Sequence, residues 1–419
     1  MNSTTSTTRS RFKTFGWIAL FVVAALIAVL LSGVYFALKP NNFTPLLLER
    51  IGRATGLEIT AKGRTDINWR GTPYIVLRDV EAHAVGERTA LLTAARIKIA
   101  MPWVTLKSRG QTLVVDRVEL DAPVLDLAAF RRWQDARPKT TSQIPEFKHG
   151  ISVKRGQVVG QGWRVEAFDL DVPYFSMQKP VQGHLSGQFS NDSVRMQFDL
   201  GAALTRPASG AGFALNGSAS IFSGDWALAT RPRLQGVLAL DKGDVRLHQG
   251  TLGAYAEYRT GTHILPMALG LRGDWQLNST GLQLAPAQVA LRGKDKIPTL
   301  DATGHVRFGH EIDVALEGTL AQWPASWPAL PSPFNQHTGG RAFALNYQGD
   351  AGLSAPFELQ LRQPGLEFAG KFEAREVLAW TQASDQGTPI PPIQGRLKAS
   401  RLDVGDIRLE GVEIDVDDK

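Results

Sequence analysis

Residues 194–200 read VRMQFDL, so apolar and polar side chains alternate strictly along this stretch. Successive side chains of a β-strand point to opposite faces of its sheet, so the alternation predicts a strand with one apolar and one hydrated face. Such strands are typical of antiparallel sheets, because parallel sheets are buried on both faces and read as continuous apolar runs. The stretch therefore predicts an antiparallel sheet that keeps one face in water.

The same two-residue period recurs along most of the chain after residue 57. Clusters of Gly, Pro, Asn and Asp separate the alternating segments at intervals typical of hairpins. The pattern predicts roughly twenty strands, whereas helical periodicity is confined to short segments. The clearest further strands are expected at 312–316, 357–361, 366–372 and 412–416, and short helices at 43–54 and 128–137, with a turn near 102–107.

An uncharged run of 23 residues, Gly16 to Leu38, precedes the β region. A helix rises about 1.5 Å per residue, so this run is long enough to cross a hydrocarbon core of about 30 Å. Trp17 and Tyr35 lie near its two ends, where such rings favour the membrane interface. The run therefore predicts a membrane anchor.

Arg9, Arg11 and Lys13 precede the run, and positive charge is retained on the cytoplasmic side of a membrane. We therefore expect the N-terminus inside and everything after residue 40 outside. The alternative is a cleaved signal peptide, whose apolar core is about 7–15 residues long and ends at a small-residue cleavage site. The run here is longer, and residues 35–40 (YFALKP) fit such a site poorly.

Composition narrows the class of function. Apolar residues make up 43% of the 419-residue chain, which is enough for a substantial core. The formal net charge is +6, but acidic and basic residues are interleaved, so no nucleic-acid partner is expected. The chain has no cysteine, which excludes disulfides, thiolate metal sites and a cysteine nucleophile.

No catalytic constellation is visible in the sequence. It holds no GxSxG elbow, P-loop or HExxH motif. Its eight histidines are scattered, and His305 and His310 would point to opposite faces of a strand. We therefore predict that the chain is not an enzyme and has no catalytic residue, metal site or cofactor. The remaining alternative is an exported enzyme whose site the sequence does not reveal.

Something must cover the apolar face of the predicted sheet. Two sheets can pack face to face as a sandwich, or one curved sheet can keep its apolar face as a groove that an apolar ligand fills. Small residues in the apolar phase either leave room beneath a curved sheet or mark bulges, and the periodicity leaves both arrangements open. The residues that would line a groove are Val194, Met196, Phe198, Leu200, Val314, Leu316, Leu359, Leu361, Phe368 and Phe372.

Six short motifs follow the predicted anchor in a set order. They are TGLEI (55–59), GRTDINW (63–69), PYIVLRDV (73–80), AARI (94–97), GQTLVVDRVELDAPVL (110–125) and GISVKRGQV (150–158). In this order they resemble the N-terminal region of the AsmA family of Gram-negative bacteria, whose relatives include TamB and YhdP. The likeness covers about residues 15–170.

The resemblance implies more than the periodicity does. Members of the AsmA family are anchored in the inner membrane and reach into the periplasm. They resemble bridge-like lipid-transfer proteins, in which a taco-like β-sheet holds acyl chains along a hydrophobic groove. The family therefore implies non-enzymatic phospholipid transport between inner and outer membrane, with the inner membrane, phospholipids and other envelope proteins as partners. The alternative function is a scaffold for outer-membrane protein assembly that acts by strand addition.

Residues and resemblance together give an expected organisation. The fold class is mainly β: an N-terminal transmembrane helix followed by an elongated, curved antiparallel β-sheet with a hydrophobic groove and few short helices. A polar, proline-containing stretch is expected to be a linker. The expected segments are a cytoplasmic tail (1–14), the transmembrane helix (15–38), an AsmA-like N-terminal region (41–135), the linker (136–148) and the extended antiparallel sheet (149–419).

Overall fold

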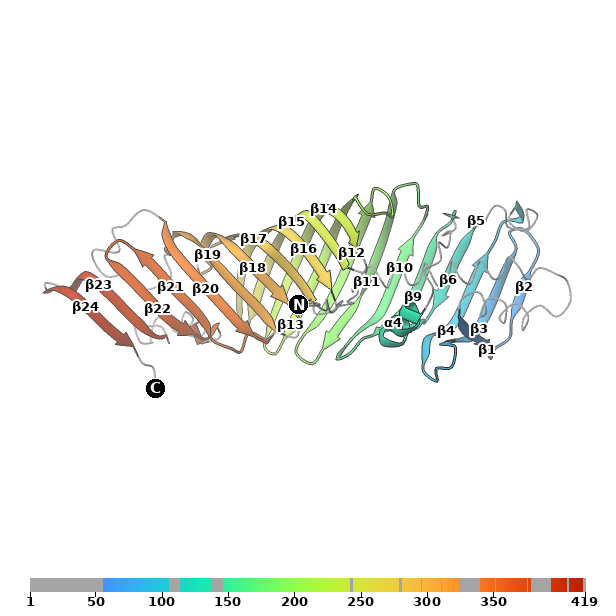
Figure 1. The fold of residues 1–419 in the computed structure, drawn as a ribbon, viewed down its shortest axis with the longest axis horizontal. Helices are drawn as coiled ribbons and strands as arrows, with labels where there is room; N and C mark the ends of the chain where they lie inside the picture. Colours follow the sequence, from blue (N-terminus) through green and yellow to red (C-terminus); the bar gives the residue numbers. More distant parts are fainter. Residues whose placement is uncertain are drawn as a thin grey trace, which may run out of the picture. The chain divides into compact units, whose positions relative to one another are not determined.

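Figure 1 shows the computed structural model of the chain. The predicted anchor with Trp17 and Tyr35, the tail before it and the helix expected at 43–54 lie outside the described residues. In the part of the chain that is described, no helix has both the length and the apolar character needed to span a membrane. The described residues are 56–104, 114–136, 146–241, 244–278, 281–294, 296–309, 311–324, 340–350, 352–374, 376–377, 393–404 and 407–416.

The described residues are mainly β, which confirms the mainly β character predicted from the two-residue period. They form twenty-four strands and one helix, and twenty-two of these strands belong to one largely antiparallel sheet. Strands β5 and β8 form a separate two-stranded sheet. Internal contacts divide the chain into two units, and their border falls between residues 233 and 234, within strand β14 (Trp226–Asp241).

The unit that spans residues 16–233 begins with two short strands, β1 and β2, which both pair with β3. Strand β3 pairs with β4. From β9 to β13, each strand pairs antiparallel with the next one in the sequence. Its strands are β1 (Leu57–Ala61), β2 (Asp66–Asn68), β3 (Tyr74–Ala84), β4 (Ala90–Ala100), β5 (Val114–Val115), β6 (Arg117–Asp121), β7 (Val124–Asp126), β8 (Glu146–Phe147), β9 (Ile151–Val159), β10 (Trp163–Val172), β11 (Val181–Asn191), β12 (Arg195–Leu204) and β13 (Ala211–Ser223).

The expectation of a purely antiparallel sheet is wrong in one part of this unit. Strand β9 runs parallel to β6 and β7, with Val118 opposite Ile151 and Leu125 opposite Val158. Parallel neighbours need a crossover connection of about a dozen residues or more, usually a helix. Helix α4 (Leu127–Ala136) lies in the connection between β7 and β9, which explains why parallel pairing occurs here.

Helix α4 confirms the helix expected at 128–137 to within one residue. Asp126 caps its start, because its Oδ1 accepts a hydrogen bond of 2.8 Å from the backbone N–H of Ala129. The helix contacts β4 and β7 and buries Phe130 and Trp133, whose ring centroids lie 5.3 Å apart. Most of the expected linker, residues 137–145, lies outside the described residues.

The unit that contains residues 234–419 has a simpler topology. Each described pairing in it is antiparallel and joins strands that are consecutive in the sequence. This is the arrangement expected for a series of hairpins. Its strands are β15 (Asp244–Thr260), β16 (His263–Asn278), β17 (Gly281–Gly293), β18 (Thr299–Phe308), β19 (Ile312–Gln322), β20 (Arg341–Gly349), β21 (Phe357–Gln363), β22 (Leu366–Phe372), β23 (Gln394–Val404) and β24 (Ile407–Val416).

Bulges in β15 and β17 shift the register of three pairings, β15–β16, β16–β17 and β17–β18, at the same level of this second unit. On one side of the bulges, Leu247, Trp275 and Leu284 lie opposite one another. A bulge changes the phase of the alternation, so bulges at matching positions keep the apolar face continuous from strand to strand. On the other side of the bulges, the facing residues are Gly250, Gly273 and Ala287.

Gly217 shows why some positions on the apolar face must be glycine. Its φ is +150°, and a Cβ atom there would lie 2.1 Å from the Asp199 carbonyl oxygen on β12. Gly201 lies on the same pair of strands, opposite Asn216, but a Cβ atom at Gly201 would meet nothing closer than 3.6 Å. Only the first of these glycines is therefore required by the backbone.

We predict that Gly217→Ala lowers the stability of the full chain by about 1–3 kcal/mol, because alanine is strained at this φ and clashes with β12. Gly201→Ala is the matched control and should leave stability unchanged or slightly higher, because alanine restricts the unfolded chain. Thermal unfolding followed by circular dichroism measures both. Equal midpoints for the two variants would contradict the backbone argument.

Candidate functional site

The ten groove candidates lie on or next to four strands. In β12, β21 and β22 they are half-buried and alternate with exposed neighbours, as their period predicted. The structure places four of them in the 16–233 unit and six in the other unit. Val194 immediately precedes β12, which carries Met196, Phe198 and Leu200; β19 carries Val314 and Leu316, β21 carries Leu359 and Leu361, and β22 carries Phe368 and Phe372.

In the 16–233 unit the candidates on β12 have facing residues on both neighbouring strands. A Cβ atom at Gly187 would lie 3.0 Å from the Phe198 ring, so this ring lies close against the glycine. In the row through Phe198, one large residue therefore lies between two small ones. The rows across β11, β12 and β13 are Phe189–Met196–Ile221, Gly187–Phe198–Ala219 and Leu185–Leu200–Gly217.

In the second unit the register brings the candidates of three strands into common rows. Leu361 lies opposite Phe368, and Leu316 is linked to Leu359 through Leu345 on β20. Residues in one row point to the same face of the sheet. From β19 to β24, two of these rows are Gly318–Phe343–Leu361–Phe368–Leu397–Ile414 and Leu316–Leu345–Leu359–Gly370–Gly395–Val416.

An aromatic cluster lies beside these rows. The rings of Phe357 and Phe372 stack with centroids 5.5 Å apart, and Phe357 contacts Tyr347 at 4.4 Å. Tyr347 lies opposite Val314 and is 2% exposed. Burial raises the pKa of the Tyr347 hydroxyl, which donates a hydrogen bond of 2.8 Å to the Asp350 carbonyl oxygen. The cluster therefore has its one polar group satisfied.

The apolar face at the groove candidates differs from the core of β3 and β4 in how completely it is covered. Leu77 on β3 and Ile97 on β4 are 1% and 0% exposed. Phe198, Leu361 and Phe368 are only half-buried although they point to the apolar side. Covering apolar surface is worth about 25 cal/mol per Å². A ligand that covered these side chains would therefore gain binding free energy from the part that is left in water.

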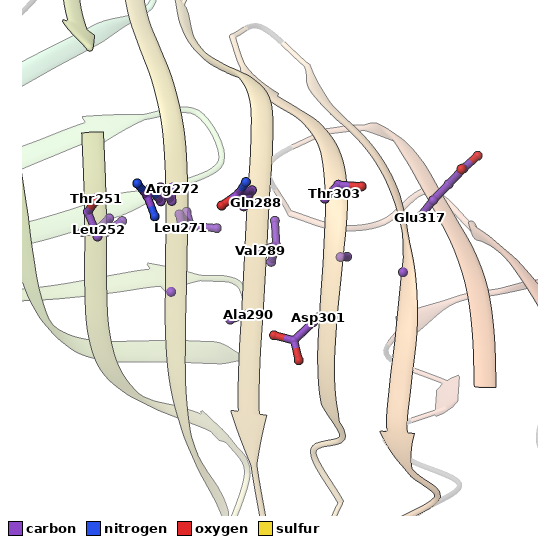
Figure 2. A pocket seen from close by; sticks show the side chains of 13 residues that line it. Thr251, Leu252, Leu271, Arg272, Gln288, Val289, Ala290, Asp301, Thr303 and Glu317 are labelled. Atoms are coloured by element: carbon purple, nitrogen blue, oxygen red, sulfur yellow. The ribbon is translucent and has the colours of Figure 1, made fainter. Parts of the chain in front are cut away.

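A hollow of ≈ 480 Å³ lies in the second unit, and Figure 2 shows the side chains that line it. Its lining comes from five consecutive strands, β15 to β19, and not from one loop or helix end. The lining includes residues of the apolar rows, such as Leu271 and Val289, and residues of the hydrated face, such as Arg272, Gln288 and Glu317. A second hollow of ≈ 630 Å³ extends over β21 to β24. Glu358, Lys371 and Arg396 of the hydrated face line this second hollow, so neither hollow belongs to the apolar face alone.

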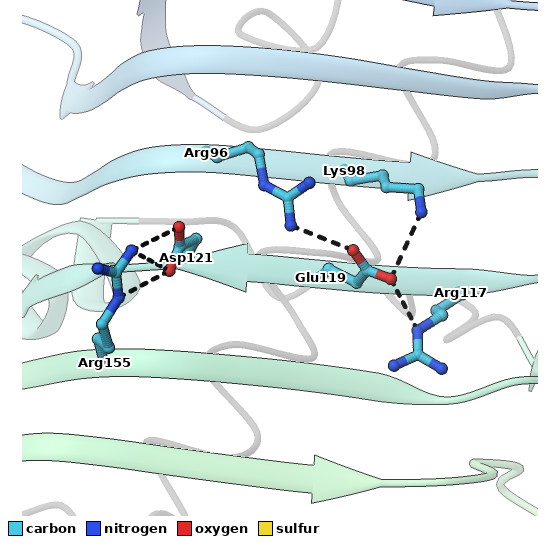
Figure 3. A network of polar contacts seen from close by, with 6 residues as sticks. All are labelled: Arg96, Lys98, Arg117, Glu119, Asp121 and Arg155. Atoms are coloured by element: carbon cyan, nitrogen blue, oxygen red, sulfur yellow. Dashed lines mark hydrogen bonds and ion pairs between the residues drawn. The ribbon is translucent and has the colours of Figure 1, made fainter.

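The opposite face of the sheet is held by ion pairs across strands. The Glu119 carboxylate on β6 forms ion pairs with two cations of β4 (Figure 3). Its distances to Arg96 and Lys98 are 3.3 Å and 3.5 Å. Arg117 contacts the same carboxylate at 3.0 Å. Further pairs on this face are Arg155–Asp121, Lys154–Asp169, His184–Asp199, Arg292–Asp301, Lys371–Glu358 and Arg396–Asp415. The charges are thus spread along the hydrated face, as the cluster around Glu119 and as cross-strand pairs.

Within the described residues, no group of three or more His, Asp or Glu side chains could hold a metal ion. His305 lies 3.3 Å from Asp313 as one of the cross-strand pairs, and His310 falls outside the described residues. The Arg132 guanidinium lowers the pKa of the Glu87 carboxyl through hydrogen bonds of 2.9 and 3.0 Å. Exposed pairs of this kind are typical of a hydrated surface.

The ten positions predicted from the sequence leave out several residues of the same cross-strand rows. Phe343 and Leu345 on β20 and Leu397 on β23 have the same register as the candidates. Residues 341–347 read RAFALNY, so the two-residue alternation that identified the other strands could have found the residues on β20. The candidate face is therefore wider than the ten predicted positions.

Comparisons of the chain with protein-family models, with curated proteins and with solved structures found no match. The function must therefore be argued from the sheet and from the sequence.

We predict that Glu119→Gln lowers the stability of the full chain by about 1 kcal/mol at low salt, because three cations lose their common partner. The loss should shrink as salt is added, since salt screens the remaining repulsion. The matched control is Glu358→Gln, which removes a single pair with Lys371 whose side chains are 51% and 59% exposed. Its effect should be near zero. Equal, salt-independent losses in urea denaturation would contradict the role of the network.

Proposed function

We propose that this chain is a non-enzymatic, inner-membrane-anchored periplasmic protein that binds phospholipid acyl chains in a β-sheet groove. In this role it supports lipid transport between the inner and outer membranes. The predicted anchor at 16–38 and the AsmA-like motif order support the location and a phospholipid ligand. The half-buried apolar face supports the binding mode.

The observation that carries the proposal is a row of apolar side chains on an incompletely covered face. In the second unit the row from Gly318 to Ile414 crosses six strands, β19 to β24. Neighbouring strands are about 4.8 Å apart, so six strands give a row about 24 Å long. A row of this length can contact an extended acyl chain along most of the chain's hydrocarbon.

The arrangement of strands favours a groove over a sandwich. A sandwich needs a second sheet of comparable size against the apolar face. Apart from the large sheet, the described residues contain only the two-stranded pair of β5 and β8. A lipid ligand therefore fits the half-buried face better than a second protein layer does.

Transfer along such a face needs no covalent chemistry. Each CH₂ group that is buried contributes about 0.8 kcal/mol, so several groups together hold a chain firmly. Successive rows present similar apolar side chains, so a lipid that moves by one row exchanges one set of contacts for an equivalent set. The net free-energy change of each step is then small, while the polar head group stays in water.

We predict that Phe198→Asp lowers the number of phospholipids that co-purify with the full chain by about twofold or more, because a carboxylate interrupts the apolar row. Gln197→Asp is the matched control on the hydrated face of the same strand and should keep the wild-type number. Native mass spectrometry with lipid extraction, on protein made in a Gram-negative host, measures this number.

Circular dichroism of both variants separates binding from folding. Loss of lipid from Phe198→Asp together with collapse of its β-signal would contradict the claim that this residue serves binding. A wild-type chain that folds without any phospholipid would contradict the proposed function itself and favour assembly by strand addition.

A further inference from the structure

A group of exposed apolar residues lies where β2 ends, β3 begins and β4 ends. We call it the tryptophan patch; it consists of Ile67, Trp69, Trp103 and Val104. Their exposed fractions are 38%, 46%, 45% and 50%. The two rings contact each other, with centroids 6.3 Å apart. Large side chains that gather at the surface in this way mark interaction sites more often than isolated ones do.

The rings of the patch are held in place although they are exposed. The Trp103 indole N–H donates a hydrogen bond of 2.9 Å to the Gly71 carbonyl oxygen. The adjoining turn is fixed by Asn68, whose amide donates to the Tyr74 hydroxyl at 3.1 Å and whose Oδ1 accepts from the Arg70 backbone N–H at 2.8 Å. A partner would therefore meet a preformed surface and would not have to order it.

The patch is continuous with the buried apolar face of the 16–233 unit. Ile67 lies opposite Ile75, and Ile75 lies opposite Ile99. Along this row the exposed fraction falls from 38% at Ile67 to 6% at Ile75 and 1% at Ile99. The patch is thus the place where the apolar face reaches the edge of the sheet.

Basic side chains flank the patch. Arg70 directly follows Trp69 and is exposed. The Arg64 side chain, two residues before β2, is 89% exposed, although its Nε lies 3.5 Å from the Asp66 carboxylate. Indole rings beside cationic side chains match the boundary of a phospholipid bilayer, where rings lie among the head groups and cations meet phosphate. This chemistry favours a lipid surface over a protein partner.

The tether from the predicted anchor enters the sheet at the other end of β3. Residues 39–55 connect the anchor to the start of the described chain. The chain enters β1 at Leu57, opposite Ala84, at the far end of β3 from Tyr74. The eleven residues of β3 are about 37 Å long, which is the distance that this connection has to cover when the patch lies on the bilayer that holds the anchor.

We propose that the tryptophan patch is a second membrane contact, which seats the N-terminal edge of the sheet on the phospholipid bilayer in which the chain is anchored. The inference rests on the membrane anchor of the proposed function. It adds a site that orients the sheet, so that the apolar face begins at the bilayer surface.

The absence of cysteine allows a direct test, because a single introduced cysteine takes a fluorophore selectively. The full chain is labelled at Thr72→Cys, beside the patch, with an environment-sensitive dye. It is then reconstituted in vesicles of phosphatidylethanolamine and phosphatidylglycerol that contain a lipid with a quencher near the head group. The control label is at Ile264→Cys, an exposed apolar position in the other unit, where the side chain is 56% exposed.

The label at Thr72 should lose about half or more of its emission in quencher vesicles, and the label at Ile264 should lose little. Replacing both rings (Trp69→Ser and Trp103→Ser) should abolish the quenching at Thr72 while the protein still floats with the vesicles. Quenching that survives the double replacement, or equal quenching at both labels, would overturn the proposal. So would no quenching at Thr72.

Vesicle flotation separates this outcome from failure of the proposed function. A chain that floats and co-purifies with phospholipid but shows no quenching at Thr72 disproves the patch alone. A chain that does not float disproves the anchor and the patch together.

Discussion

The two-residue repeat of the β-strand is the constraint on which the rest of this structure depends. It separates an apolar face from an ion-paired face along each strand, and a slip of one residue would exchange the two faces. On β22, such a slip would move Phe368 into water and Glu367 onto the apolar side. Cross-strand pairs such as Lys371–Glu358 on one face and Leu361–Phe368 on the other both favour the same register.

Much of the fold follows from this repeat and could be predicted. The alternation at 194–200 and 357–361 identified β12 and β21, and the apolar phase placed Phe198 and Leu361 on the correct face. Helix α4 was visible as a short helical period. The repeat is a local property, so it predicts strands and faces reliably but says little about which strands become neighbours.

The remaining features depend on contacts that local periodicity does not encode. Strand β9 pairs in parallel with β6 because helix α4 lies in the connection between them. The sequence of β9 itself does not indicate whether its neighbour is parallel or antiparallel. The register shifts at β15 to β17 require three strands to be compared at once. The sequence does not distinguish Gly217 from the other small residues of the apolar phase, because its backbone φ of +150° is known only from the structure. The extent of the candidate face was underestimated for a different reason, because the alternation at 341–347 was visible in the sequence but was not used.

Photo-crosslinking from single positions tests the central claim, that the apolar face carries lipid, most directly. The photoreactive residue p-benzoylphenylalanine would replace Phe368 on the apolar face or Glu367 on the hydrated face, in the full chain within living Gram-negative cells. Mass spectrometry of the purified protein then detects lipid adducts. We expect phospholipid adducts from position 368 and none from position 367. Adducts from neither position, or equally from both, would contradict a lipid-carrying face.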